Sequence, residues 1–247
     1  MLIVANWKAY VEDVEKARAL LALSKRLVRS AEATIVLAPP APLLGVLAVK
    51  NTSKVLFSAQ DVSASAGGAE TGEITARSYA SAGASYAIIG HSERRAQGDT
   101  DAIVAEKLSR ALTHGLTPIL CVGEQERDVE GRYLSIIREE MTRALEPLTP
   151  KERERVVVAY EPLWAIGKDS FSAIKPNDLA EMALYIRKVL SELLPGKNSR
   201  ASLVLYGGSV DPENVVDLIQ GSGIDGLLIG HASADLDVFS RLVKELV

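Results

Sequence analysis

Lysine, histidine and glutamate each appear at or just after the end of a short apolar run of the sequence. Lys8 follows "LIVAN", His91 follows "YAIIG", and Glu161 ends "VVVAYE". A carboxylate can accept a proton as a general base, an imidazole can donate a hydrogen bond to a carbonyl, and an ammonium group can balance the charge of an anion. If the three groups meet, they suit proton transfer in an anionic substrate.

Each of these residues also has a plain structural interpretation. Glu161 could be a rim carboxylate in a salt bridge, His91 a structural histidine with satisfied hydrogen bonds, and Lys8 a solvated surface charge. Two local features favour a catalytic role for Glu161 and His91. Pro162 holds the residue before it extended, and a short helix opening at Ser92 would disfavour the charged form of His91 through its dipole. Spacing alone leaves both interpretations open.

Two glycine-containing turns near the end of the chain indicate a phosphate site. "YGGSVDPENV" (206–215) and "IGHAS" (229–233) each follow an apolar run. Glycine lets backbone N–H groups approach a phosphate closely. Asp211 and Pro212 predict a helix start, with an N-cap before a proline. One Gly-Gly pair is more often only a turn, but two such turns on adjacent units favour a binding site.

A long loop follows the glutamate. "PLWAIGKDSFSAIKP" (162–176) begins with the apolar anchor Trp164 and contains Gly167 as a flexible point. Loops of this length inside a compact barrel are more often functional than accidental. The segment predicts a lid that excludes water, and a merely long connection is the alternative.

These residues need a fold that brings strand ends together. Eight apolar runs are separated by segments of helical period such as 14–28 and 178–194, and Asp99 and Thr100 offer caps before another helix. The alternation, without a break in composition, predicts an α/β protein, a single-domain (β/α)8 TIM barrel over 1–247. An open doubly wound sheet is the alternative. The runs are 2–6, 34–38, 55–60, 86–90, 117–123, 156–161, 202–207 and 226–230.

Composition argues against several classes of protein. The chain has 247 residues and a net charge of −4, which does not suit a surface for nucleic acid or an anionic membrane. No apolar run approaches the length of a transmembrane helix, and the N-terminus lacks a signal-peptide pattern. The lone cysteine, Cys121, cannot form an intramolecular disulfide, which is typical of a reducing compartment. We expect a cytoplasmic protein that binds neither nucleic acid nor membrane.

Five motifs connect the chain to a known family. "ANWK", "IIGHSERR", "CVGE", "VAYEPLWAIG" and "YGGSV" occur in this order, each at the end of a predicted strand. Together they resemble the triosephosphate isomerase family along the whole chain. The resemblance implies a glycolytic and gluconeogenic enzyme that interconverts dihydroxyacetone phosphate and D-glyceraldehyde 3-phosphate by proton transfer through an enediolate. It also implies that no metal and no organic cofactor takes part.

The resemblance implies roles for individual residues. Glu161 would be the catalytic base, His91 the neutral group at the carbonyl, and Lys8 the cation that neutralises developing negative charge, as is known of this family. Asn6 would help to orient the substrate, and Glu93 would be the ion-pair partner of Lys8. The backbone N–H groups that hold the phosphate would belong to Gly167, Ser209, Gly230 and His231.

Three stretches depart from the family pattern. The loop between Gly167 and Pro176 is two residues longer than usual, and Asp169 stands near the second usual glycine. His231 replaces the second of two adjacent glycines, where a left-handed backbone would cost about 1 kcal/mol or more. We expect phosphate affinity to be retained but altered. Tyr10 stands where asparagine is common, and we expect little effect there.

A further loop predicts the oligomeric state. "GGAETGEIT" (67–75) resembles the projecting loop that, in this family, inserts beside the active site of the partner subunit. Thr71 would reach the neighbour, and Glu70 replaces an often aromatic residue, which removes apolar interface area. The expected assembly is a homodimer through this loop.

Two alternatives to this function stay open. Another phosphosugar isomerase or an aldolase would need a Schiff-base lysine at a strand end or metal ligands, and the predicted strand ends carry no cluster that indicates a metal site. A catalytically altered phosphate-binding barrel protein, with another phosphosugar or a scaffold role, would share the fold. The presence of Asn6, Lys8, His91 and Glu161 argues against a silent protein, which would not need all four.

Overall fold

The strands form a closed parallel barrel. The computed structural model describes residues 1–30, 33–167, 174–194 and 202–246. Each strand pairs with the next in sequence order, and the last strand pairs with the first. The predicted (β/α)8 barrel is confirmed, and an open doubly wound sheet is excluded. The strands are β1 (Leu2–Asn6), β2 (Thr34–Ala38), β3 (Leu56–Ala59), β4 (Tyr86–Ile89), β5 (Thr117–Val122), β6 (Val157–Tyr160), β7 (Val204–Tyr206) and β8 (Gly226–Ile229).

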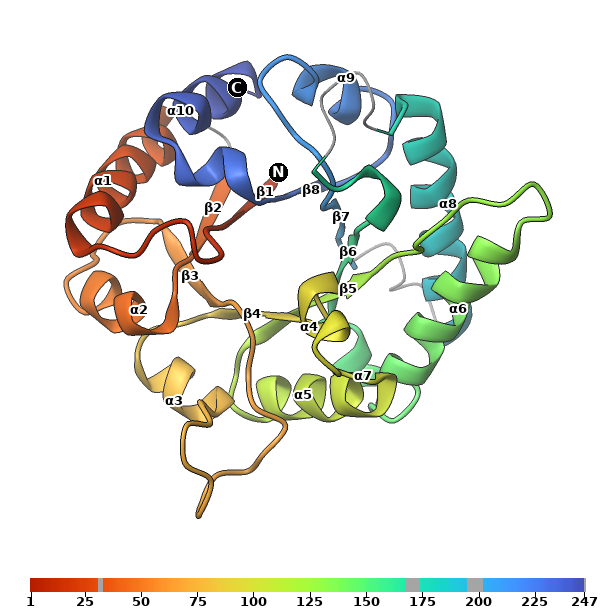
Figure 1. Ribbon diagram of the computed structural model, residues 1–247, viewed down its shortest axis with the longest axis horizontal. Coiled ribbons are helices and arrows are strands. Elements are labelled where there is room, and N and C mark those ends of the chain that lie inside the picture. Colours follow the sequence, from red (N-terminus) through yellow and green to blue (C-terminus); the bar gives the residue numbers. More distant parts are fainter. Residues whose placement is uncertain (31–32, 168–173, 195–201, 247) are drawn as a thin grey trace.

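Most helices form a ring around the strands, as Figure 1 shows. They are α1 (Val14–Ser30), α2 (Ala41–Ala48), α3 (Ala76–Ser81), α4 (Ser92–Ala96), α5 (Asp101–Thr113), α6 (Arg132–Leu145), α7 (Pro150–Arg153), α8 (Pro176–Leu193), α9 (Val215–Ile219) and α10 (Leu236–Glu245), together with the 3₁₀-helices η1 (Leu163–Ala165) and η3 (His231–Ala234). In the described parts of the chain, no helix has the length and apolar character needed to cross a bilayer.

Side chains of each strand alternate between two apolar layers. In β1, Leu2 and Val4 belong to a cluster that includes Cys121 of β5, and parity along the strands places this cluster inside the barrel. Ile3 and Ala5 belong to the larger cluster between the strands and the surrounding helices. Because both faces of each strand are buried, the strands appear in the sequence as continuous apolar runs rather than alternating ones.

Of the helix starts predicted from capping residues, the one at Thr100 is correct and the one at Asp211 is wrong. The Thr100 side chain caps α5 and accepts the backbone N–H of Ile103 at 3.3 Å, as expected. The start predicted at Asp211 is wrong, because α9 begins at Val215. The side chain of Asn214 accepts the N–H of Asp211 at 2.9 Å, and the carbonyl of Asp211 accepts the N–H of Val215 at 3.1 Å, so residues 211–214 form a turn that leads into the helix.

Barrel closure requires a glycine in β8. Gly226 pairs with Leu2, and an ideal Cβ at Gly226 would lie 1.9 Å from the carbonyl oxygen of Leu2. The carbonyl of Leu2 belongs to the backbone of a paired strand, so it cannot move aside as the end of a flexible side chain can. The first and last strands therefore approach each other closely only because this position has no side chain.

Alanine substitutions at two glycines should have opposite effects on stability. Gly226→Ala should destabilise the protein by about 1–3 kcal/mol or more, since β8 must move away from β1. Gly45→Ala, inside α2, would place its Cβ no closer than 3.9 Å to Ala82. It should stabilise the protein by about 0.5–1 kcal/mol through helix propensity. Urea unfolding of both variants measures the difference. A Gly226→Ala protein as stable as wild type would show that closure tolerates a side chain there.

Candidate active site

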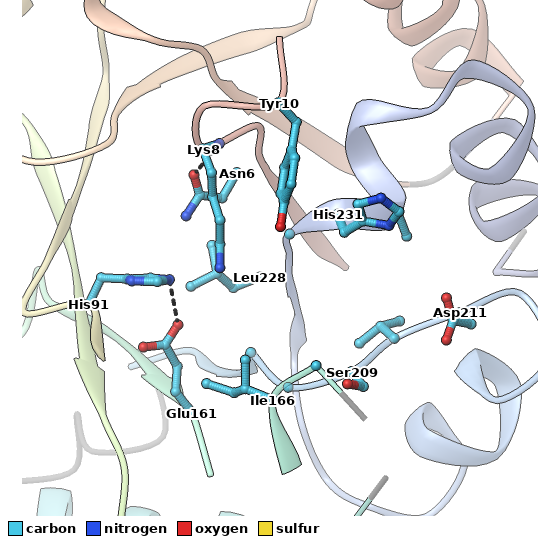
Figure 2. A pocket seen from close by; sticks show the side chains of 16 residues that line it. Asn6, Lys8, Tyr10, His91, Glu161, Ile166, Ser209, Asp211, Leu228 and His231 are labelled. Carbon is cyan, nitrogen blue, oxygen red and sulfur yellow. Dashed lines mark hydrogen bonds and ion pairs between the residues drawn. The ribbon is translucent and has the colours of Figure 1, made fainter. Parts of the chain in front are cut away.

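A pocket of about 360 Å³ opens at the carboxyl ends of the strands, and every residue predicted for the site lines it. Figure 2 shows His91 and Glu161 on one side of the pocket and Ser209 and His231 on the other. The structure therefore brings together residues that are far apart in sequence. The predicted residues lining the pocket are Asn6, Lys8, His91, Glu161, Gly167, Ser209, Gly230 and His231.

The short helix after β4 fixes the orientation of His91. His91 is the N-cap of α4, which begins at Ser92 as expected, and its Nδ1 accepts the N–H of Glu93 at 3.2 Å. An accepting Nδ1 assigns the proton of the neutral imidazole to Nε2. Nε2 lies 3.2 Å from Oε1 of Glu161, along the dashed line of Figure 2. The ring thus presents a donor to the pocket.

Glu161 is buried, with only 2% of the residue exposed, and its two carboxylate oxygens have different partners. Oε1 faces His91, while Oε2 accepts the backbone N–H of Ser92 at 3.2 Å. The backbone N–H of Glu161 donates to the carbonyl of Val122 in β5 at 2.8 Å. An ideal Cβ at Gly207 would lie 2.9 Å from Cγ of Glu161, so this glycine makes room for the carboxylate.

Lys8 has a strained backbone that its neighbours hold in place. Its φ of 44° is the one positive φ of a non-glycine residue in the described segments. The Lys8 N–H donates to Oδ1 of Asn6 at 3.1 Å, and the Lys8 carbonyl accepts from Nε2 of Gln60 at 2.9 Å. Sparsely populated backbone angles of this kind cluster at functional sites, where surrounding contacts over-determine them.

The Lys8 side chain is paired with Glu93. Its Nζ lies 2.6 Å from Oε1 of Glu93, which is the ion pair that the family resemblance implied. Burial opposes ionisation of Glu93, but the hydrogen bond and the positive charge of Lys8 hold the pKa of this carboxyl below its ordinary value. The pair therefore positions the ammonium group of Lys8 at the pocket before any anion enters it.

The opposite side of the pocket consists of backbone turns. Gly167 has a φ of 71°, and the hydroxyl of Ser209 donates to the carbonyl of Ala165 at 3.0 Å, which joins the turns after β7 and β6. His231 begins η3 and has no positive φ, so the strain that a histidine would suffer in a glycine-only conformation does not arise. Most of the longer loop, including Asp169, lies outside the described residues.

A buried glutamate connects the start of this loop to the barrel. Oε1 of Glu124 accepts the hydroxyl of Tyr160 and the indole N–H of Trp164, both at 2.8 Å. The carbonyl of Glu124 also accepts the N–H of Leu163 at 2.9 Å. Trp164 is thus tied to β5 and β6 on the pocket side of the barrel, which supports its interpretation as an anchor for the loop.

Two polar side chains of the pocket wall, Tyr10 and Asp211, were not predicted as site residues from the sequence. Asp211 lines the pocket instead of capping a helix, and Tyr10 lines it two positions after Lys8. Neither residue type marks a site by itself. The closeness of Tyr10 to Lys8 in the sequence was the available signal, because one short loop after β1 carries both residues.

A second cavity lies behind Glu161, and Cys121 and Glu140 line it. Burial and the neighbouring Glu161 carboxylate raise the pKa of the Cys121 thiol, so this cysteine stays neutral and is a poor nucleophile. The carboxylate of Glu140, in α6, accepts the N–H of Gly123 at 3.0 Å. Burial raises the pKa of Glu140 to about 7, although Arg95 and the Gly123 hydrogen bond act in the opposite direction.

The pocket combines a carboxylate, an imidazole donor and a paired ammonium group with glycine-rich turns opposite them. In the described residues, no group of three His, Cys, Asp or Glu side chains could hold a metal ion. A (β/α)8 barrel with these groups at its carboxyl end has the arrangement of a barrel enzyme that works by acid–base chemistry.

Comparisons with known proteins identify the family to which the chain belongs. The family model for triosephosphate isomerase matches residues 1–246. The chain is 41% identical over 247 residues to the triosephosphate isomerase of Thermus thermophilus, covering 99% of this chain and 98% of that protein. Identity to the triosephosphate isomerase of a Roseiflexus species is 38% over 248 residues, covering 99% and 97% of the two chains. The chain belongs to the triosephosphate isomerase family, as its motifs predicted.

Stability should depend on pH through Glu140. Its folded pKa of about 7 lies above the ordinary 4.5 of the unfolded chain. The contribution of this group to stability is thus fully present below pH 4.5 and is lost as pH rises through 7, by about 2–4 kcal/mol. In Glu140→Gln, which keeps a hydrogen-bond acceptor, the free energy of unfolding should fall less between pH 5 and pH 8 than in wild type.

Urea unfolding at both pH values checks this expectation. Glu139→Gln is the matched control, because Glu139 is exposed on the same helix and pairs with Arg143 at 3.1 Å. Its pH dependence should match that of wild type. Parallel profiles for Glu140→Gln and wild type would contradict the assignment of a raised pKa.

Proposed function

We propose that this protein interconverts dihydroxyacetone phosphate and D-glyceraldehyde 3-phosphate by proton transfer through an enediolate, a step of glycolysis and gluconeogenesis. The observation that carries the proposal is the contact of 3.2 Å between Nε2 of His91 and Oε1 of Glu161, in the pocket that also receives Lys8. Family membership supports the same function. Nothing favours another phosphosugar or a scaffold role.

The chemistry assigns one task to each of three groups. Glu161 takes a proton from the carbon next to the carbonyl and returns it to the neighbouring carbon. His91 donates its Nε2 proton to the carbonyl oxygen that gains charge, and Nε2 takes a proton back from the hydroxyl on the neighbouring carbon, so that the two oxygens exchange roles while Glu161 moves the carbon-bound proton. Lys8 supplies positive charge to the same region, and Asn6 supports the Lys8 backbone through its hydrogen bond of 3.1 Å.

The turns opposite these groups suit the phosphate. Backbone N–H groups near Gly167, Ser209, Gly230 and His231 would hold it, since these residues line the same pocket and carry little side-chain bulk apart from His231. The phosphate then fixes the distance between the reacting carbons and the base. Binding energy from this remote group serves to orient the carbon skeleton for proton transfer.

We further propose a homodimer through residues 67–75. Figure 1 shows that the segment between β3 and α3 projects beyond the ring of helices. A hollow of about 520 Å³ lies beside Lys8, His91 and Glu93 on the side away from the phosphate turns. Exposed Thr71 of one subunit would enter that hollow in the other. This arrangement would brace the loop that positions Lys8.

Two expectations about domain organisation and cellular location accompany the proposed function. Residues 1–247 would act as one domain, which the pairing of β8 with β1 supports. A cytoplasmic location would suit a glycolytic enzyme with a single buried cysteine, since free thiols persist in reducing compartments.

Glu161→Gln should lower kcat by about 10³–10⁴-fold, because an amide cannot act as the base. Binding of inorganic phosphate should change little, since Glu161 lies on the other side of the pocket. Turnover of glyceraldehyde 3-phosphate, coupled to glycerol-phosphate dehydrogenase, measures the first quantity and calorimetry the second. Glu15→Gln, on the exposed face of α1, is the matched control and should be as active as wild type. Turnover close to wild type in Glu161→Gln would falsify the assignment of the base.

Thr71→Arg should weaken the dimer, because a longer side chain at the tip of the loop would hold the loop away from the hollow and bring its positive charge beside Lys8 and Arg94, which line that hollow. Sedimentation velocity at micromolar concentration should give a dimer mass for wild type and a larger monomer fraction for the variant. Thr52→Arg, at another exposed threonine, should leave the mass unchanged. A fully active wild-type monomer would count against the proposed assembly.

A further inference from the structure

Tyr10 and His231 are in direct contact in the pocket wall. Their ring centroids are 5.1 Å apart, and the ring planes meet at 83°, which is an edge-to-face pair. Tyr10 follows β1 and His231 follows β8, so the contact joins the loops of the first and last strands. Both residues line the pocket that holds His91 and Glu161.

The hydroxyl of Tyr10 is directed into this pocket. Figure 2 shows the Tyr10 side chain running alongside Lys8, with its oxygen pointing inward. The Tyr10 backbone is held in place, because its N–H donates to the carbonyl of Trp7 at 2.9 Å and its carbonyl accepts from Nζ of Lys16 at 3.3 Å. Within the described residues no hydrogen bond uses the Tyr10 hydroxyl, so this donor is available to a ligand.

The two loops fit together residue by residue. The side chain of Lys8 passes over Gly230, since an ideal Cβ built at Gly230 would lie 3.4 Å from Cε of Lys8. Two residues further on, Tyr10 packs against His231. Alternate residues of the first loop therefore contact consecutive residues of the last loop. Removing the His231 ring would leave Tyr10, which is 50% exposed, without its aromatic support.

We propose that Tyr10 is an additional substrate-binding residue whose hydroxyl donates a hydrogen bond to the substrate phosphate, and that His231 positions its ring. The inference rests on the proposed function, since it assigns a residue to the phosphate side of that site. The contact with His231 places Tyr10 at the turn after β8, which is the phosphate side, and away from Glu161. A phenol is a strong donor to a dianion, and hydrogen bonds to charged groups are the stronger class.

Tyr10→Phe tests the hydroxyl alone, because phenylalanine keeps the ring and its contact with His231. KM for dihydroxyacetone phosphate should rise about tenfold, and kcat should stay within about twofold, as expected for binding that is equal in the ground state and the transition state. Tyr86→Phe is the matched control, because Tyr86 begins β4 at the far end of the barrel. An unchanged KM in Tyr10→Phe would overturn the proposal, since a merely structural pair would keep its ring contact.

Binding of inorganic phosphate separates this inference from the proposed function. Calorimetry on wild type and Tyr10→Phe should show an affinity loss of about the same factor as the rise in KM, and this measurement needs no turnover. A wild-type protein that binds phosphate but does not isomerise triose phosphates would refute the proposed function, while the loss in Tyr10→Phe would still support the role of Tyr10. Equal affinities in both proteins, or no phosphate binding to wild type, would overturn the Tyr10 proposal.

The positioning role of His231 needs its own variants. His231→Ala should raise KM about threefold in wild type and should have no further effect in Tyr10→Phe, because the two residues act through one hydrogen bond. His231→Phe, which keeps an aromatic ring and removes the imidazole nitrogens, should restore the wild-type KM. Independent effects of the two substitutions, or failure of His231→Phe to restore KM, would refute positioning by the ring.

Discussion

Parallel closure of β8 on β1 is the constraint on which the rest of the structure depends. A closed barrel of parallel strands has all its carboxyl ends at one rim, so residues that follow different strands must face a common space. Lys8, His91 and Glu161 meet for this reason, although the chain separates them widely. The closure itself depends on Gly226, where the backbones of β8 and β1 leave no room for a side chain.

Once the groups meet, each charge has a partner in the protein. The carboxylate of Glu161 is buried and is compensated by the N–H of Ser92 and by His91. Lys8 is compensated by Glu93 instead, at 2.6 Å. Because α4 supplies both the Ser92 N–H and the side chain of Glu93, this five-residue helix organises the charges on both sides of His91. These contacts offset the cost of burying the Glu161 carboxylate and place its charge beside the imidazole before substrate binds.

Backbone geometry supports the same arrangement. Lys8 has a φ of 44°, which its neighbours Asn6 and Gln60 hold by hydrogen bonds. Gly207 lies so close to Cγ of Glu161 that any side chain there would displace the carboxylate. The contact between Tyr10 and His231 joins the loop that carries Lys8 to the turn after β8, which we propose to bind phosphate. The geometry of the site therefore depends on the same meeting of β1 and β8 that closes the barrel.

Much of this protein was determined by its sequence alone. Apolar runs alternating with helical segments predicted eight strands and the barrel, because the periods of strands and helices are local properties. Residue types at the strand ends, with their motifs, predicted the family and the candidate site. Only the tertiary structure decided the tautomer of His91, the buried environment of Glu140, the start of α9 at Val215 and the contact between Tyr10 and His231. Each of these depends on neighbours that folding supplies, and no local pattern of residues encodes them.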